Sequence, residues 1–410
     1  MSESPRGEAT LKLLLIGEEH VRAKVARHYQ LLEEDAGIET HYFVDDRSGI
    51  TRELQAQGAP LRIEQAPVPE RSLPGILRYW SAFARCLKRV RPQVLEVYTS
   101  IHWAVLYPMV LYARAHGIPV AVVCRGELYP QYFYNETGPI KRWSLVQILR
   151  AADLIVYKEP WMLPILERFA PGVRRFEWFN AVPIGPEPGV EREGNVVLYL
   201  NFFKRFRNLD VAVRAAALVR EQVPDVRFLL VGGTSELAEK SQFYADLLAY
   251  ERELVALVEE LGLGGTVEIL PFTNQVDPFF SAAKIYLLPA DTVFCNFGLL
   301  EAMERGVPAV VTGEKDPDAA RIVEDGVSGR VVNIDPGELA EAVIGMLQDE
   351  DARREMARAA REKIVRSFNL GSLIGSLAQQ YQQLARPGGA QRPRRASLNT
   401  AVGESASSTT

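Results

Sequence analysis

Short apolar runs alternate with stretches of helical periodicity along almost the entire chain. The runs of the first half are Lys12–Ile16, Glu39–Val44, Val94–Tyr98, Val120–Cys124, Leu154–Tyr157 and Arg175–Phe179. Those of the second half are Val196–Leu200, Arg227–Val231, Val267–Leu270, Ile285–Leu288, Ala309–Val311 and Gly329–Val332. Helical patterns separate most of them, for example Val211–Glu221, Ala245–Leu261, Leu299–Arg305 and Pro336–Leu347. Val, Ile and Leu strands joined by crossover helices are typical of covered parallel sheets, so the pattern predicts an α/β protein with two doubly wound, Rossmann-like domains facing across a cleft.

One segment interrupts this alternation. Ile184–Gly194 is rich in proline, glycine and glutamate and has no periodicity, which marks a domain boundary. We expect a disordered N-terminus at 1–9, a first domain at 10–185 and a second at 186–370. The last helical segment, Asp351–Leu384, ends in a helix at 371–385 that is expected to pack back on the first domain. The tail at 386–410 has few apolar residues, so we expect it to be disordered.

Composition narrows the functional classes. The chain is 47% hydrophobic and 24% charged, with 47 basic and 52 acidic residues and a formal net charge of −5. No attraction to nucleic acid follows from these values. The three cysteines, Cys86, Cys124 and Cys295, form no metal or disulfide pattern and fit a reducing compartment. Since no signal peptide or transmembrane run is evident, we expect a cytoplasmic protein, with peripheral contact at the inner membrane face left open.

The segment 76–90 bears on that membrane contact. Its apolar residues form one helical stripe, made of Ile76, Trp80, Phe83, Leu87 and Val90. Such a stripe suits either a crossover helix that packs on its sheet or an amphipathic helix that lies on a membrane surface. The crossover helix is the favoured interpretation.

The stretch Ile285–Gly313 carries the clearest chemical signal. It reads as a buried strand, an irregular loop, a helix that begins at a glycine and a second buried strand. A helix N-terminus at the carboxyl edge of parallel strands is a natural anion site, because its free N–H groups and its dipole both favour phosphate. Glu301, near the start of this helix, supplies a carboxylate that can accept hydrogen bonds from a ribose diol. The stretch therefore suggests an enzyme that holds a nucleotide diphosphate.

Five blocks of the second half carry a resemblance to a known family. They are NFFKRFRNLDVAVRAAALV (Asn201–Val219), FLLVGG (Phe228–Gly233), GTVEILPFTN (Gly265–Asn274), FGLLEAMERGVPAVVTG (Phe297–Gly313) and RIVEDGVSGRVV (Arg321–Val332). In this order they resemble the retaining glycosyltransferases of the GT-B class called family 4. In the first half, RGELY (Arg125–Tyr129) and FNAVP (Phe179–Pro183) resemble the family more loosely. The resemblance implies a GT-B fold in which the second domain holds a nucleotide-sugar donor and the first holds the acceptor.

The resemblance assigns roles to the basic loop that follows Val196–Leu200. Lys204, Arg205 and Arg207 are expected to contact the diphosphate, with Arg207 at the position of the family's conserved lysine. GT-B enzymes use such cations and a helix N-terminus in place of a metal, so neither a metal nor a cofactor besides the donor is expected. The family's arginine just after the strand falls on Phe202. The alternative interpretation of the loop is a solvated basic surface.

The same resemblance assigns Glu301 to the donor ribose, as the second carboxylate of the family's Glu-x7-Glu motif; the alternative is an exposed helix glutamate that pairs with a neighbour. The first carboxylate falls on Val293, and Asp291 and Asn296 are polar groups near the same space. Further donor-side positions expected to bind substrate are Gly232, Gly233, Phe272, Asn296, Phe297, Gly298 and Leu299. The positions expected to bind substrate in the first domain are Gly17, Arg125 and Glu127, with Arg125 contacting either the phosphate or the acceptor.

The activity implied is transfer of a sugar from a nucleotide diphosphate donor to an acceptor hydroxyl with retention at the anomeric carbon. The catalytic residues are expected to be Arg207, Lys204 and Glu301. No protein base is required, because the leaving phosphate can accept the proton. The acceptor stays open between a glycan, a lipid-linked molecule and a small molecule. Two alternatives remain: a non-catalytic GT-B relative that binds a nucleotide or a partner, suggested by Val293 and Phe202, and a nucleotide-sugar epimerase on the same scaffold.

Overall fold

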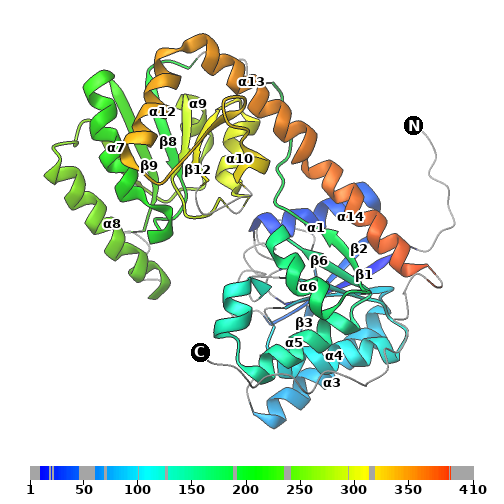
Figure 1. Ribbon diagram of the computed structural model, residues 1–410. Coiled ribbons are helices and arrows are strands. Elements are labelled where there is room, and N and C mark those ends of the chain that lie inside the picture. The colour runs from blue at the N-terminus through cyan, green and yellow to red at the C-terminus, as the bar shows by residue number, and fades with distance from the viewer. Residues whose placement is uncertain are drawn as a thin grey trace, which may run out of the picture. The chain divides into compact units, whose positions relative to one another are not determined.

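The structure is a computed structural model. It describes residues 10–17, 20, 23–45, 61–68, 72–99, 101–124, 128–187, 192–234, 242–293, 295–313, 319–386 and 388. The chain divides into two compact units, Met1–Phe179 together with Ile374–Thr410, and Asn180–Leu373. Each unit is built around one sheet flanked by helices (Figure 1).

The first unit holds a seven-stranded sheet in the order β3-β2-β1-β4-β5-β6-β7, and its pairings are parallel. Its strands are β1 (Lys12–Ile16), β2 (Glu39–Val44), β3 (Arg62–Gln65), β4 (Val94–Tyr98), β5 (Val120–Val123), β6 (Leu154–Tyr157) and β7 (Arg174–Glu177). Its helices include α1 (Ala23–Ala36), α3 (Leu73–Val90), α4 (Trp103–Ala115), α5 (Pro139–Ala151), α6 (Leu163–Phe169) and most of α14 (Leu370–Ala385). Short turns of π-helix (Tyr132–Glu136) and 3-10 helix (Pro160–Met162) precede α5 and α6. The strand order winds outward from β1 in both directions, which confirms the doubly wound class.

The second unit repeats this design with a six-stranded parallel sheet in the order β10-β9-β8-β11-β12-β13. Its strands are β8 (Asn195–Leu200), β9 (Val226–Gly233), β10 (Val267–Pro271), β11 (Ile285–Leu288), β12 (Ala309–Thr312) and β13 (Gly329–Val332). Its helices include α7 (Leu209–Gln222), α8 (Gln242–Glu260), α9 (Asp277–Ala282), α10 (Phe297–Glu304), α11 (Ala319–Ile322), α12 (Pro336–Gln348) and α13 (Glu350–Ser367). A 3-10 turn at Arg205–Arg207 precedes α7. The predicted second α/β domain is therefore present.

The edge strand β3 was not predicted from the sequence. Its residues, Arg-Ile-Glu-Gln, are half-buried or exposed. The strand lies at the edge of the sheet and pairs only with β2 among the described strands. An edge strand needs no continuous apolar run, because hydrogen bonds to one neighbour hold it in place. The apolar pattern that identified the central strands is therefore missing.

The helical segment expected over Asp351–Leu384 is in fact two helices, α13 and α14. Asn369 stands between them, and its Oδ1 accepts a hydrogen bond from the Gly371 N–H at 2.9 Å. The backbone there also pairs with Val182, whose N–H donates to Phe368 O at 3.0 Å and whose carbonyl accepts from Leu370 N at 2.9 Å. These bonds satisfy backbone groups that an uninterrupted helix would use internally, so they favour a break.

The apolar stripe of α3 packs against the core of the first unit. Phe83, Leu87 and Val90 are buried, and Ile76 and Trp80 are partly buried against the same cluster. This is the packing expected of a crossover helix. None of the described helices is long and apolar enough to cross a membrane.

A buried polar cluster fixes α14 to the first unit. Glu96 on β4 is fully buried, and its carboxylate accepts hydrogen bonds from the hydroxyls of Tyr29 on α1 and Tyr381 on α14. His20 Nε2 lies 3.0 Å from the same carboxylate. Burial and the neighbouring Glu96 raise the pKa of Tyr29 well above its usual value, which keeps its hydroxyl protonated as a donor.

Tyr381→Phe is expected to lower the stability of the first unit by about 1–2 kcal/mol, because Glu96 loses one donor while remaining buried. The urea midpoint of the unfolding transition assigned to that unit measures the loss. Tyr132→Phe, at an exposed tyrosine, is the control and should leave the midpoint unchanged. Equal midpoints for both variants would show that the cluster does not anchor α14.

Candidate active site

Three loops meet at the carboxyl edge of the second sheet, after β8, β9 and β11. β8 lies between β9 and β11, and the chain winds away from it on both sides. Ligands of open α/β sheets bind at such a switch point. Hydrogen bonds join the loop after β8 to the loop after β11: the Asp291 N–H donates to Phe206 O at 2.8 Å, and Asn208 Nδ2 donates to Asp291 Oδ1 at 3.0 Å.

Close backbone approaches hold these loops together. Gly232 has a φ of +142°, and a Cβ on it would lie 1.9 Å from the carbonyl oxygen of Asn201. A Cβ on Gly298 would lie 2.4 Å from Tyr286 Oη and 2.8 Å from Leu200 O. Only glycine fits at either position, because any side chain would collide with backbone atoms. The start of α10 is therefore seated directly on the end of β8.

Arg207 is the central cation of this edge. Its side chain is only 8% exposed, and its Nη1 donates to Thr292 O at 3.4 Å. Its Nε is buried without a hydrogen-bond partner, and no carboxylate of the described residues forms an ion pair with it. Removing a guanidinium from water without an anion is costly. A negatively charged ligand at this edge would compensate the buried charge.

Lys204 and Glu301 stand in the same electrostatic environment. Partial burial and the charge of Arg207 lower the pKa of Lys204, so the two cations are close enough to repel each other. Burial raises the pKa of Tyr286, while Arg207 lowers it and Glu301 raises it further. The β8 loop and α10 thus bring Arg207, Lys204 and Glu301 into one region.

Arg205 does not join this group. Its guanidinium forms a two-pronged ion pair with Glu253 on α8, at 2.8 and 2.6 Å, and lies 5.1 Å from the ring centre of Tyr250. The side chain is exposed and its charge is already matched. The expectation that Arg205 binds substrate is not supported, because the 3-10 turn points Arg205 and Arg207 to different sides.

The N-terminus of α10 is capped by the protein itself. Asn296 is buried, and its Oδ1 accepts a hydrogen bond from the Leu299 N–H at 3.2 Å. The Leu299 side chain belongs to the core, so neither its side chain nor its N–H is offered to a ligand. Phe297, half-buried, and the backbone of Gly298 form the rest of the first turn.

The family's first carboxylate position is part of the core. Val293 is fully buried, so an aliphatic anchor replaces a sugar-facing glutamate. Asp291, named as a possible substitute, accepts the hydrogen bond from Asn208 that joins the two loops. Cys295 in this loop has a φ of +46°, and its carbonyl accepts from Asn180 Nδ2 at 2.8 Å. The loop is thus held by apolar packing and backbone bonds.

An aromatic pair was missed by the sequence analysis. Phe202 stacks on Phe272, with ring centres 4.8 Å apart and planes 14° apart, and the Phe272 N–H donates to Gly233 O at 2.8 Å. Phe272 is 40% exposed. The two residues come from loops after β8 and β10, so no local pattern could reveal the pair. It forms a flat apolar surface beside Gly233.

Glu251 on α8 was also missed. It is buried, and its Oε2 accepts a hydrogen bond from the Thr234 N–H at 2.5 Å. A Cβ on Gly233 would lie 2.8 Å from Glu251 Oε1, so glycine is needed for this contact. The carboxylate stabilises the turn after β9. The sequence did not indicate this role, because a glutamate within a helix is ordinarily a solvent-exposed residue.

The acceptor-side positions lie in the first unit and are only partly described. Gly17 has a φ of +103° and donates its N–H to Phe43 O at 3.1 Å at the end of β1. Arg125 and Glu127 lie outside the described residues.

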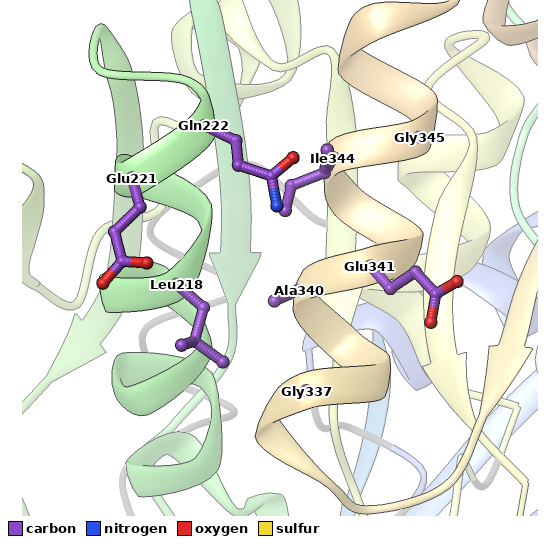
Figure 2. A pocket seen from close by; sticks show the side chains of 8 residues that line it. All are labelled: Leu218, Glu221, Gln222, Gly337, Ala340, Glu341, Ile344 and Gly345. Carbon is purple, nitrogen blue, oxygen red and sulfur yellow. The ribbon is translucent and has the colours of Figure 1, made fainter.

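A groove of about 380 Å³ lies between α7 and α12, and Figure 2 shows its lining. Leu218 and Gln222 of α7 face Ala340 and Ile344 of α12. These α7 residues belong to the last turns of the helix, whereas Arg207 precedes its first turn. Since α7 runs away from the carboxyl edge, the groove is separate from the candidate active site.

Two family models match this chain. Residues 19–175 match the model described as glycosyl transferase 4-like domain, and residues 185–363 match glycosyl transferases group 1. An N-acetyl-alpha-D-glucosaminyl L-malate synthase of Bacillus anthracis is 23% identical over 49% of this chain and 48% of its own length. A D-inositol 3-phosphate glycosyltransferase of Mycolicibacterium vanbaalenii is 31% identical over 42% of this chain and 37% of its own length. The chain thus spans about half or less of the length of these relatives.

A solved structure shares the fold over nearly its whole length. Anabaena Alr3699/HepE in complex with UDP-glucose has a TM-score of 0.68 at 16% identity, covering 91% of this chain and 99% of that protein. One glycosyltransferase model covers most of the first sheet and its helices, and the other covers the site built around Arg207. The chain belongs to the family-4-like glycosyl transferases of group 1, with the two Rossmann-like domains of the GT-B fold.

Proposed function

We propose that this protein transfers a sugar from a nucleoside diphosphate donor to an acceptor hydroxyl. The observation that carries the proposal is Arg207, a buried guanidinium with no carboxylate partner among the described residues, at the switch point of the second sheet. Lys204 adds a second positive charge beside it. A diphosphate supplies the anion that this pair lacks. The family membership and the nucleotide-sugar complex of the related structure support the same ligand.

The site supports the following reaction. The bond between the anomeric carbon and the diphosphate oxygen breaks, and negative charge accumulates on the diphosphate. Arg207 and Lys204 stabilise that charge without reorganising, because the fold already holds them in place. The acceptor oxygen bonds to the anomeric carbon from the side the diphosphate leaves, and a phosphate oxygen takes its proton. Retention follows in this scheme, and the anomeric proton coupling of the product tests it by NMR.

Donor identity and metal independence are tested together by thermal stabilisation. The protein is heated with UDP-, GDP-, ADP- and dTDP-sugars in the presence of EDTA. A donor at about 100 times its Kd should stabilise the native state by about 2.7 kcal/mol and raise the melting temperature. A shift with one base that survives EDTA is the expected result. No shift with any donor would contradict donor binding, and a shift abolished by EDTA would contradict metal-free binding.

Glu301→Gln is expected to weaken binding of that nucleoside diphosphate by about 10- to 100-fold, because a charged hydrogen-bond acceptor for the ribose is replaced by a neutral amide. Isothermal titration measures the affinity. Glu260→Gln, at the exposed end of α8, is the matched control and should bind as the unmodified protein does. Equal affinity in both variants would remove Glu301 from the ribose site.

A second candidate function is donor binding without turnover. Val293 favours it, because the core aliphatic side chain leaves no carboxylate at the position that faces the sugar in the family. Donor binding combined with no product across glycan, lipid-linked and small-molecule acceptors would establish this alternative. We also propose a cytoplasmic location, supported by three cysteines that form no disulfide in the described part of the chain.

A further inference from the structure

Three consecutive helices of the first unit, α3, α4 and α5, carry basic residues and no acidic ones. Their charged residues are Arg78, Arg85, Lys88, Arg89, Arg114, Lys141, Arg142 and Arg150. The chain as a whole has a net charge of −5, so this is a local separation of charge. Helices that only cover a sheet usually carry both signs on their solvent side.

These helices form one continuous surface. α3 packs against α4 and α4 packs against α5, and Figure 1 shows the three together beside the first sheet. Arg89 pairs with Glu64, and Arg114 pairs with Asp153 at 2.9 Å. Arg85, Lys88 and Lys141 are exposed and form no ion pair with any carboxylate of the described residues. The surface is therefore positively charged.

Large apolar side chains are exposed on the same surface. Ile140 and Trp143, in the first turns of α5, are 63% and 56% exposed. Tyr132 and Tyr134 are exposed in the π-helical turn just before them. Trp143 makes an edge-on contact with Tyr107 of α4, with ring centres 5.7 Å apart. The apolar group is thus held by the fold and is adjacent to Lys141.

The start of α3 extends this group. Leu73 is 69% exposed and Leu77 is also exposed, whereas the stripe of α3 that faces the sheet is buried. The helices run back from the carboxyl edge of a parallel sheet, so the first turns of α3 and α5 lie at the same edge. Exposed apolar side chains of both helices therefore lie at one edge of the sheet, with the exposed Arg85 and Lys88 further along α3.

We propose that this face, defined by Leu73, Leu77, Arg85, Lys88, Tyr132, Tyr134, Ile140, Lys141 and Trp143, docks on the surface of a bilayer that contains anionic lipids. Tryptophan and tyrosine place an apolar ring and a polar group at the level of the headgroups, and leucine and isoleucine bury their side chains below them. Lysine and arginine add attraction to anionic headgroups. A protein partner of opposite charge is an outcome of the test and not the favoured occupant, because exposed tryptophan and tyrosine side chains next to lysine are typical of a bilayer interface. An enzyme held there reaches acceptors anchored in lipid.

Flotation of the full-length protein with vesicles tests the proposal. One set contains phosphatidylcholine alone and the other contains phosphatidylcholine with phosphatidylglycerol. We expect binding to the anionic vesicles, weaker binding at high salt, and little binding to the neutral ones. The double variants I140S/W143S and R85E/K88E should each lower the partition coefficient about tenfold or more.

Matched controls lie in the second unit. Val255→Ser removes an exposed aliphatic side chain on α8, and Arg366→Glu reverses an exposed charge on α13; both should bind vesicles as the unmodified protein does. No binding to anionic vesicles, or full binding by both double variants, would overturn the proposal. The proposal would also be overturned if the unmodified protein bound no vesicles but self-associated, and the same double variants abolished that self-association. Donor-induced thermal stabilisation should be unchanged in the double variants, which separates failure of the membrane surface from failure of the donor site.

Discussion

Arg207→Ala is expected to lower kcat/KM by about 10²- to 10³-fold, the usual effect of removing one preorganised group that stabilises developing charge. The expectation rests on the position of Arg207, buried at the switch point and without a carboxylate partner among the described residues. Because that buried charge has no anion when the donor is absent, its removal should leave the melting temperature unchanged or raise it. Activity should therefore fall while the melting temperature stays the same or rises. Initial rates against donor concentration and a thermal scan of the free protein measure the two effects.

Arg205→Ala is the matched control for this prediction. It removes the same side chain two positions away in the same 3-10 turn, but that side chain is exposed and paired with Glu253. We expect kcat/KM within about twofold of the unmodified protein, since exposed pairs contribute little. Arg207→Lys should recover part of the activity, because a positive charge remains in place. A large loss in Arg205→Ala together with normal activity in Arg207→Ala would reverse the assignment.

Gly232→Ala is expected to abolish measurable donor binding and to destabilise the second unit by about 3 kcal/mol or more, a cost typical of severe overpacking in a region that cannot relax. The added Cβ would lie 1.9 Å from Asn201 O. The backbone there cannot move away freely, because the Asn201 N–H donates to Val231 O at 3.0 Å. The loop that carries Lys204 and Arg207 begins at that point. Titration with the identified nucleoside diphosphate and a urea melt measure the two losses.

Gly345→Ala supplies the control for this substitution. Gly345 lies within α12, and a Cβ there meets nothing within 4 Å. The change should stabilise the second unit by about 0.5–1 kcal/mol, because alanine loses less conformational entropy in a helix. Donor affinity should not change. If Gly232→Ala behaved like Gly345→Ala, the loops after β8 and β9 would be free to separate, and the argument from close packing would be wrong.

The two departures from the family pattern have a common physical character. Phe202 replaces a cation and stacks on Phe272, and Val293 replaces a carboxylate and is buried in the core. Both exchange a polar contact with the donor for apolar packing within the protein. The charge that would contact phosphate is then concentrated on Arg207 and Lys204, which makes the effect of Arg207→Ala especially informative.

The sequence by itself determined the two parallel sheets and indicated the loops that form the candidate active site. Strands such as Leu13–Ile16 and Ile285–Leu288 are buried on both faces, so a continuous apolar run identifies them. β3 lacked that signal because a one-sided edge strand buries little. The glycines at 232 and 298 and the carboxylate at 301 were assigned to the site because the sequence blocks that contain them resemble the family.

Only the tertiary structure decided which side chains of the candidate site are available to bind a ligand. Arg205 and Arg207 look equivalent in the sequence, but one turn of 3-10 helix and the position of α8 direct the first to Glu253 and bury the second. The Phe202–Phe272 stack and the anchoring of Tyr381 on Glu96 likewise join residues that are remote in the chain. Local patterns record whether a residue is buried in a regular element. They cannot record which distant partner occupies the remaining space, because that partner is set by the packing of the whole unit.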